Sequence, residues 1–413
     1  MAKKNSTKTV PELRFRGFTD PWEQRQLGEV AQFSKGQGYS KADLCSNGIP
    51  AFLYGQMYTD YKLLVTESGQ YLPQNSDGVF SAAGDVIIPA SGESPEEIAI
   101  ASVIGKTGIL LGGDLNIIKP EKSILDSIFL ALSASGGRLH GSLVSRAQGK
   151  TIVHLHNSDI AASQIRFPTL PEQRRIGWFF ATLDSLVAAA ERQETLLRKK
   201  KQAYLQLMFP QEGETEPRLR FAGFSGEWEP LQLGELYAKN IERNGNQFDA
   251  EKTLSVSSMT FNASGNGAAE ESLSTYKVLR IGDAAFEGHT SNEFAFGRFV
   301  VNTLGDGIMS PRFAAIRPTA RWRESCDLDF WSYYLHDENV MKRILVRSTK
   351  RGTMMNELVL DDFFMERIRV PSLPEQRRIG DFFSALDNLI AATKQRTESL
   401  RALKSAYLQR MFV

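Results

Sequence analysis

The 413-residue sequence is poor in the features that mark disulfide-rich, zinc-binding or membrane-spanning proteins. Its two cysteines, Cys45 and Cys326, lie far apart and belong to no CxxC or mixed His/Cys spacing, which argues against a disulfide framework and a zinc knuckle. No apolar run approaches the roughly 18 to 20 residues that cross a bilayer, and the lysines of Met1–Lys8 have no apolar segment behind them. We therefore expect a reduced, cytoplasmic protein with no membrane contact.

An excess of either charge is also missing. The 49 Lys and Arg residues and 48 Asp and Glu residues leave a net charge of +1, which excludes a uniformly basic nucleic-acid binder but not a local basic face. With 42% hydrophobic and 23% charged residues, the chain is not predominantly disordered. At roughly 150 residues per domain, its length suggests two or three domains.

Catalytic motifs are absent as well. GKT occurs at Gly105 and Gly149, but the position five residues before each glycine holds Ile or Val where a phosphate-binding loop needs glycine. The sequence has no HExxH, no GxSxG, no GxGxxG before a helix, and no Asn/Asp-Pro-Pro-aromatic motif of an amino-methyltransferase. His154 and His156 alternate as on a strand and lack further ligands at a suitable spacing. We expect neither a metal site nor independent catalysis.

The most informative feature is an internal repeat. Residues Leu170–Phe209 recur as Leu373–Phe412, with about 24 of 40 positions identical. A shorter pair precedes them, in which LRFRGFTDPWEQRQLGEV from Leu13 matches LRFAGFSGEWEPLQLGEL from Leu219. The intervening stretches are nearly equal in length but align poorly, apart from anchors such as Gly149 and Gly352. This order suggests one scaffold that carries two different specificities.

The longer repeated segment has the pattern of a long helix. Thr169 and Ser372 stand three residues before Glu172 and Glu375, which is a capping-box spacing, and a proline falls in each first turn. A heptad seam follows over about 35 residues, or roughly 50 Å, and predicts pairing as a coiled coil. The alternative is two unrelated surface helices. The predicted coiled-coil or partner-interface residues are Ile176, Phe179, Leu183, Leu186, Leu197, Tyr204, Ile379, Phe382, Leu386, Leu389, Leu400 and Tyr407.

These patterns predict an α+β protein with two mixed domains of about 140 residues that alternate with the two long helices. Strand-like runs cover 85–89, 98–104 and 299–302, and helical runs cover 123–132 and 328–346. The acidic, Pro- and Gly-containing PQEGETEP from Pro210 reads as an exposed linker. The expected boundaries are a first domain over 1–168, a helix over 169–209, a linker over 210–218, a second domain over 219–371 and a helix over 372–413.

Basic residues gather at matching points of the two domains. Residues 127–158 contain no acid, and Met341–Arg351 has five basic side chains and no acid. Phosphate contact and a solvated helix face are both open readings of these stretches. Residues 37–41 and 54–58 add aromatic and amide groups that suit base or sugar contacts, with core or loop packing as the alternative. The DNA-binding candidates are Gln37, Tyr39, Lys41, Tyr54, Gln56, Tyr58, Arg138, Arg146, Lys150, Arg312, Arg343, Arg347, Lys350 and Arg351.

The duplicated LPEQRRI helix, the preceding L-x-F-x-G-F…W-E…L-G-E signature and the alternation of variable and near-identical regions resemble the specificity (S) subunit of type I restriction-modification enzymes. The resemblance covers about Pro11 to Phe412. It implies that each variable region is a target recognition domain for one half of a bipartite, asymmetric DNA sequence. It also implies that the two helices form an antiparallel coiled coil whose length sets the unspecific gap.

The resemblance further implies partners that carry the chemistry. Two modification subunits would hold S-adenosylmethionine and methylate adenine N6, and restriction subunits with motor and nuclease activities would use ATP and magnesium. This chain would bind double-stranded DNA, hold no cofactor and have no enzymatic activity. The alternatives are a scaffold that does not bind DNA and presents a coiled coil to protein partners, or a stand-alone enzyme.

Overall fold

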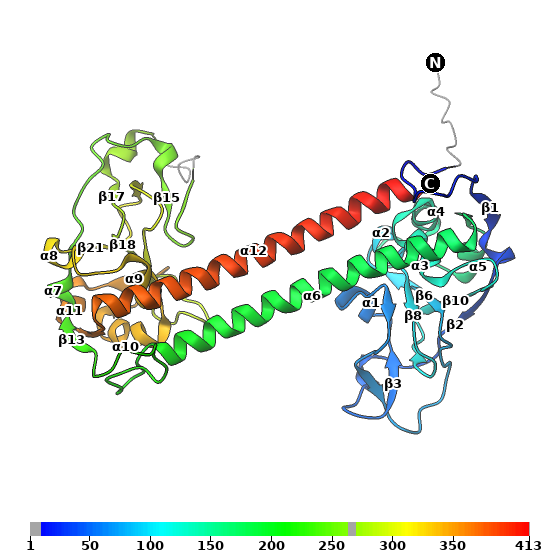
Figure 1. Cartoon of the computed structure of the whole chain (residues 1–413), viewed down its shortest axis with the longest axis horizontal. Coiled ribbons are helices and arrows are strands. Elements are labelled where there is room, and N and C mark those ends of the chain that lie inside the picture. Colours follow the sequence, from blue (N-terminus) through cyan, green and yellow to red (C-terminus); the bar gives the residue numbers. More distant parts are fainter. Residues whose placement is uncertain (1–9, 263–269, 413) are drawn as a thin grey trace, which may run out of the picture. The chain divides into compact units, whose positions relative to one another are not determined.

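The computed structural model describes residues 10–262 and 270–412 (Figure 1), so Met1–Lys8 lies outside the described residues. The described residues form two units, one made of the residues up to Arg192 with those from Lys394 onward, the other of Gln193–Thr393. Each unit therefore contains one α+β domain, half of the helix that follows it and half of the other long helix. No helix in the described ranges combines the length and apolar character that a membrane crossing requires.

The first unit centres on a five-stranded sheet in the order β2-β10-β6-β8-β4. A three-stranded sheet, β5-β3-β9, and the two-stranded ribbons β1-β12 and β7-β11 complete its strands. Its elements are β1 (Glu23–Gln26), β2 (Ala31–Lys35), β3 (Ile49–Phe52), α1 (Gln56–Thr59), β4 (Leu64–Val65), β5 (Gln70–Leu72), β6 (Asp85–Pro89), β7 (Ser91–Gly92), α2 (Pro95–Ile98), β8 (Ser102–Ile104), β9 (Leu110–Leu111), β10 (Leu115–Pro120), α3 (Ser127–Gly136), α4 (Arg138–Arg146), β11 (Val153–His154), α5 (Asn157–Ala161), β12 (Gln164–Phe167) and the first half of α6 (Leu170–Met208).

The second unit repeats this plan with a four-stranded sheet in the order β14-β21-β18-β19. Two-stranded pairs β13-β24, β15-β16, β17-β20 and β22-β23 accompany it. Its elements are β13 (Glu229–Gln232), α7 (Leu233–Leu236), β14 (Tyr237–Lys239), β15 (Leu254–Ser255), β16 (Thr260–Phe261), β17 (Lys277–Leu279), β18 (Ala284–Glu287), β19 (Arg298–Val301), β20 (Gly307–Met309), β21 (Ala315–Pro318), α8 (Ala320–Arg323), α9 (Leu328–Tyr334), α10 (Glu338–Ser348), β22 (Thr349–Lys350), β23 (Glu357–Leu358), α11 (Leu360–Met365), β24 (Arg367–Val370) and the first half of α12 (Leu373–Met411).

The two central sheets share a strand order although their sequences barely align. In each, a Gly-Asp turn leads into the middle strand, and the Asp carboxylate accepts the backbone N–H of the residue three positions earlier, Ala82 for Asp85 and Arg280 for Asp283. The preceding glycine has a positive φ of 96° at Gly84 and 88° at Gly282, which L side chains rarely adopt. The divergent regions are therefore two copies of one fold.

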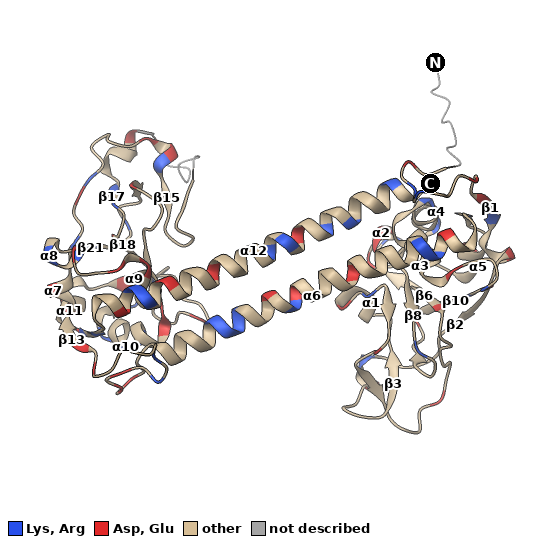
Figure 2. Cartoon of the chain, viewed as in Figure 1, with Lys and Arg blue, Asp and Glu red and all other residues tan. Residues whose placement is uncertain are grey.

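The two long helices pair antiparallel within each unit. In the first unit Phe179 meets Tyr407 with ring centroids 5.1 Å apart, and Asp184 forms an ion pair with Lys404. In the second unit Phe382 meets Tyr204 at the same 5.1 Å, and Asp387 pairs with Lys201 at 2.7 Å. Residue numbers increase along α6 as they decrease along α12, so the two helices run in opposite directions. Charges of both signs follow each other along both helices (Figure 2).

The end of each long helix completes the core of the other repeat's domain. Phe412, after α12, stacks on Phe129 of α3 at 5.4 Å, and Phe209, after α6, packs on Tyr334 of α9 at 4.9 Å. The backbone N–H of Leu13 donates to the carbonyl of Arg410, and that of Leu219 donates to the carbonyl of Leu207. The short repeated segment therefore begins where the partner helix ends.

Several local expectations from the sequence need correction. The run 98–104 is divided between the end of α2 and β8, and the run 328–346 is two helices, because Asp337 caps a new helix by accepting the N–H of Val340. The run 123–132 becomes helical only at Ser127, after Asp126 has capped α3. Both oxygens of the Glu172 side chain accept hydrogen bonds from Arg14, a contact that the capping-box spacing does not predict.

Candidate nucleic-acid interface

The repeated LPEQ motif connects each long helix to its domain. The Arg14 guanidinium donates to both Glu172 oxygens at 2.7 and 2.6 Å, and Arg220 binds Glu375 in the same way at 2.6 and 2.7 Å. Both carboxylates are only 1% exposed. Bidentate charge-assisted bonds of this kind are among the stronger ones in proteins. The short and the long repeated segments are thus the two halves of one buried contact.

The glutamine that follows satisfies backbone groups of the domain. Gln173 accepts the N–H of Asp126 and donates to the carbonyl of Ile124, and Gln376 accepts the N–H of Asp327. Both side-chain amides are buried, so the loss of one of these hydrogen bonds would leave a buried polar group without a partner and would destabilise the fold. These near-identical residues of the repeat therefore attach each long helix to its domain.

A β-hairpin follows the second helix of each domain. We call Gln148–His154 the first hairpin; two backbone bonds between Gln148 and His154, 3.0 and 2.7 Å long, close its base. It follows α4, and its strand β11 pairs with β7. A side chain at Gly149, where φ is 139°, would place its Cβ 1.9 Å from the Ile152 carbonyl oxygen. Only glycine fits there.

Residues 349–358 form the second hairpin, after α10. Thr349 pairs with Leu358 and Lys350 with Glu357. A Cβ at Gly352 would lie 2.1 Å from the carbonyl oxygen of Met355, so this glycine is also required by a close backbone approach three residues on. The matched glycines of the sequence therefore mark matched hairpins.

Candidate residues near the first hairpin come from three parts of the first domain. Lys150 is exposed on the hairpin itself. Tyr58 donates its hydroxyl to the carbonyl of Ser91 on β7, and its ring lies edge to face with Tyr54 at 6.3 Å. Burial raises the pKa of the Tyr58 phenol, so the hydroxyl stays protonated and donates this bond. Arg146 ends α4, two residues before the hairpin, and donates to the carbonyl of Ala162.

The loop of residues 36–41 carries three further candidates. Gln37 and Lys41 are exposed, and the backbone N–H of Gln37 donates to the carbonyl of Leu111. Tyr39 has a φ of 58°, and its hydroxyl donates to the carbonyl of Asp77 and accepts that residue's N–H. Tyr39 therefore fixes the loop, which supports the packing alternative for this residue.

Gln56 lies away from solvent. It is 8% exposed, and its amide donates to the carbonyl of Ser68. The structure thus places it inside the domain, where a base edge could not reach its nitrogen without a rearrangement.

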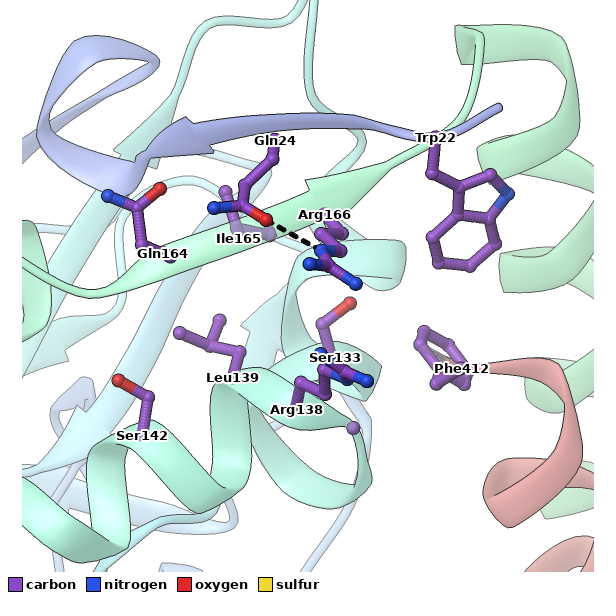
Figure 3. Close-up of a pocket in the computed structure, with 11 residues that line it drawn as sticks. Trp22, Gln24, Ser133, Arg138, Leu139, Ser142, Gln164, Ile165, Arg166 and Phe412 are labelled. Atoms are coloured by element: carbon purple, nitrogen blue, oxygen red, sulfur yellow. Dashed lines mark hydrogen bonds between the residues drawn. The ribbon is translucent and has the colours of Figure 1, made fainter. Parts of the chain in front are cut away.

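Arg138 lies at the opposite end of α4 from Arg146, about 12 Å along the helix axis at 1.5 Å per residue. It lines a pocket of about 220 Å³ with Arg166, Gln24 and Phe412 (Figure 3). Arg166 donates to the Gln24 side chain, and burial together with the Arg138 charge lowers the pKa of Arg166. The first domain's candidates therefore do not form one cluster: they lie around the hairpin, on the loop of residues 36–41, inside the domain and at a separate pocket.

The second domain's candidates are also divided. Lys350 and Arg351 are exposed on the hairpin. Arg343 and Arg347 instead face a groove that the acidic linker also lines, and they pair with Glu212 at 3.8 Å and Glu366 at 3.4 Å. The exposed Arg312 guanidinium lies 5.9 Å from the ring of Phe313.

The predicted coiled-coil residues also differ in their surroundings. Ile176, Leu183 and Ile379 are buried, and Phe179, Leu197, Tyr204, Phe382, Leu386, Leu400 and Tyr407 are half-buried. Leu186 and Leu389, which occupy equivalent positions, are 40% and 46% exposed. They are the most exposed of the predicted interface residues. In the described ranges, no group of three or more His, Cys, Asp or Glu side chains is placed to hold a metal ion.

Comparison with known proteins gives consistent similarities. A family model for the type I restriction modification DNA specificity domain matches residues 19–198 and 319–402. The specificity subunit of type I restriction enzyme MjaVIII from Methanocaldococcus jannaschii is 22% identical over a 409-residue alignment that covers 93% of this chain and 90% of the relative.

Two solved structures share the fold. The S subunit of a type I restriction-modification system from M. genitalium superposes with a TM-score of 0.59 at 15% identity, covering 98% of this chain and 99% of that one. A chain from a structure of complex assembly and conformational transition of the type I R-M system gives 0.51 at 18% identity, covering 96% of this chain and 98% of that one.

Proposed function

The chain belongs to the type I restriction modification DNA specificity family, and from this membership we propose that it is the sequence-specific DNA-recognition subunit of a type I restriction-modification complex. Each domain would read one half of a bipartite target. Because the two domains share a sheet order but differ in their exposed residues, the half-sites would differ and the target would be asymmetric.

The observation that carries this proposal is the pair of equivalent hairpins with basic side chains. Lys150 on the first and Lys350 and Arg351 on the second are exposed and suited to phosphate oxygens. Residues 127–158, which include the first hairpin, contain no acidic residue that would repel a polyanion. A near-zero net charge is compatible with DNA binding when positive charge is concentrated at two surfaces.

In this proposal the chain itself is not an enzyme. Two modification subunits would bind the antiparallel helices, hold S-adenosylmethionine and methylate adenine N6, and restriction subunits would use ATP and magnesium for translocation and cleavage. The exposed Leu186 and Leu389 are candidate contacts for these partners. The complex would act on cytoplasmic DNA.

Binding to duplex DNA at several salt concentrations tests the proposal, with the chain purified together with its methyltransferase partner. We expect a preferred sequence and a logarithmic affinity that falls linearly with the logarithm of salt concentration. The combined change Arg347→Ala, Lys350→Ala and Arg351→Ala should weaken binding and reduce the slope by up to about 0.9 for each lost phosphate contact. Arg347 should contribute least, because it already pairs with Glu366. A complex without sequence preference would refute the proposal.

A further inference from the structure

Each hairpin carries an exposed apolar side chain at its tip. Ile152 is 57% exposed on the first hairpin, and Met354 is 76% exposed on the second. Single exposed hydrophobic residues are common on protein surfaces and need no special explanation. Here, however, an exposed apolar side chain recurs at the tips of two hairpins that both follow the second helix of their domain, although Met355, and not Met354, is the counterpart of Ile152 counted from the matched glycines. Ile152 lies three residues after Gly149, and Met354 two after Gly352.

Backbone contacts hold both tips in place. The first hairpin is closed at Gln148 and His154 and joined to β7, where Val153 pairs with Gly92. In the second, the N–H of Asn356 donates to the carbonyl of Gly288 at 2.8 Å, and the backbones approach so closely that a Cβ at Gly288 would lie 2.1 Å from the Asn356 carbonyl oxygen. Ordering these tips on binding would therefore cost little conformational entropy.

The residues that precede each apolar tip are basic, small or polar, whereas Val153 and Met355 follow them. Lys150 and Thr151 precede Ile152, and Arg351, Gly352 and Thr353 precede Met354. A protein partner that covers an apolar residue needs no adjacent cations, whereas a duplex offers phosphates beside stacked, apolar bases. Proteins that deform DNA commonly insert Ile, Leu, Met or Phe against a base step while Arg and Lys hold the flanking phosphates.

We propose that Ile152 and Met354 press against the bases of the two half-sites as apolar wedges, between phosphate contacts made by Lys150 and by Lys350 and Arg351. This inference rests on the proposed DNA-recognition function and adds to it two contact residues on hairpins of fixed shape. Contact with stacked bases makes binding sensitive to how easily the local step deforms, so the wedges would contribute to sequence selectivity.

Binding by single-site variants tests the wedges in the complex with the methyltransferase partner. The probes are duplexes that carry the mapped target, the target with either half-site scrambled, or an unrelated sequence. Ile152→Ser should weaken binding to the intact target by about 10- to 100-fold, a range set by burial of one large aliphatic side chain. It should leave the salt slope and the affinity for unrelated DNA unchanged. Ile152→Met should keep most of the affinity, because it retains the apolar volume.

Two further variants distinguish the apolar contact of Ile152 from the neighbouring phosphate contact and from the contact at the second half-site. Lys150→Gln should lower the affinity for every duplex and the salt slope by about 0.9, the mark of one lost phosphate contact. Met354→Ser should cost affinity only through the second half-site, so its effect should disappear on the duplex in which that half-site is scrambled. Both tips are exposed, so thermal unfolding of the serine variants should match that of the wild type.

Two results would overturn the inference. One is an Ile152→Ser complex that binds the intact target as tightly as the wild type; the other is an equal loss on target and unrelated DNA. If the wild-type complex itself shows no preference between the duplexes, the failure lies with the proposed function and not with the wedges alone.

Discussion

Removing the guanidinium of Arg14 should destabilise the first unit strongly. In Arg14→Met, the Glu172 carboxylate loses both of its arginine hydrogen bonds, 2.7 and 2.6 Å long, in a position only 1% exposed. Breaking one side of a buried ion pair typically costs about 3–5 kcal/mol, because it leaves an uncompensated charge. Since a domain is stabilised by only about 5–15 kcal/mol, this loss is a large part of the total.

A double variant separates loss of the ion pair from loss of the arginine alone. Replacing both partners, Arg14→Met with Glu172→Met, removes the buried charge together with its partner and should restore most of the stability or exceed it.

Urea unfolding combined with amide hydrogen exchange is the appropriate assay, because exchange reports the two units separately. Protection should fall in α3 and β12 for Arg14→Met, and in α9 and β24 for the matched control Arg220→Met. A loss of less than about 1 kcal/mol in Arg14→Met, or a double variant as unstable as Arg14→Met, would contradict this prediction.

Three further predictions concern the helices, the pH dependence and the hairpin. Deleting seven residues around Gln193 together with the matching seven around Arg396 shortens each helix by about 10 Å. This deletion should change the spacer of the methylated sequence by up to about three base pairs, without altering either half-site. An unchanged spacer in methylome sequencing would contradict the prediction. Burial lowers the pKa of His336, so the folded second unit favours the neutral imidazole. The stability of this unit should therefore be full above about pH 6.5 and fall as the pH drops through the lowered pKa. In His336→Phe, the urea midpoint should depend less on pH. Gly149→Ala should reduce DNA affinity at least tenfold, because the new Cβ would collide with the Ile152 carbonyl oxygen and distort the first hairpin. The control is Gly141→Ala in α4, where a Cβ meets no other atom. This variant should bind DNA normally, and its free energy of unfolding should rise by about 0.5–1 kcal/mol.

Local patterns made the long helices and the strand over Asp85–Pro89 predictable, since heptads and continuous apolar runs are read from neighbouring residues. The strand order was not predictable, because pairing of β10 with both β2 and β6 joins residues far apart in the chain. The contact of Arg14 with Glu172 spans 158 residues for the same reason.

The candidate site was predictable in part. The basic stretches and the matched glycines, Gly149 and Gly352, pointed to the hairpins, whereas Ile152 and Met354 went unnoticed because an apolar residue is assigned to the core by default. Burial of Gln56 and the acidic partners of Arg343 depend on tertiary contacts. A single sequence does not reveal which surface a side chain faces.

The central claim is that this chain selects the DNA sequence on which its partners act. Mapping N6-methyladenine across the genome of the source cell, with and without this chain, tests it most directly. We expect one asymmetric, bipartite motif that disappears when the chain is deleted and that changes in only one half when one domain is exchanged. A methylation pattern that is the same in both cells would contradict it.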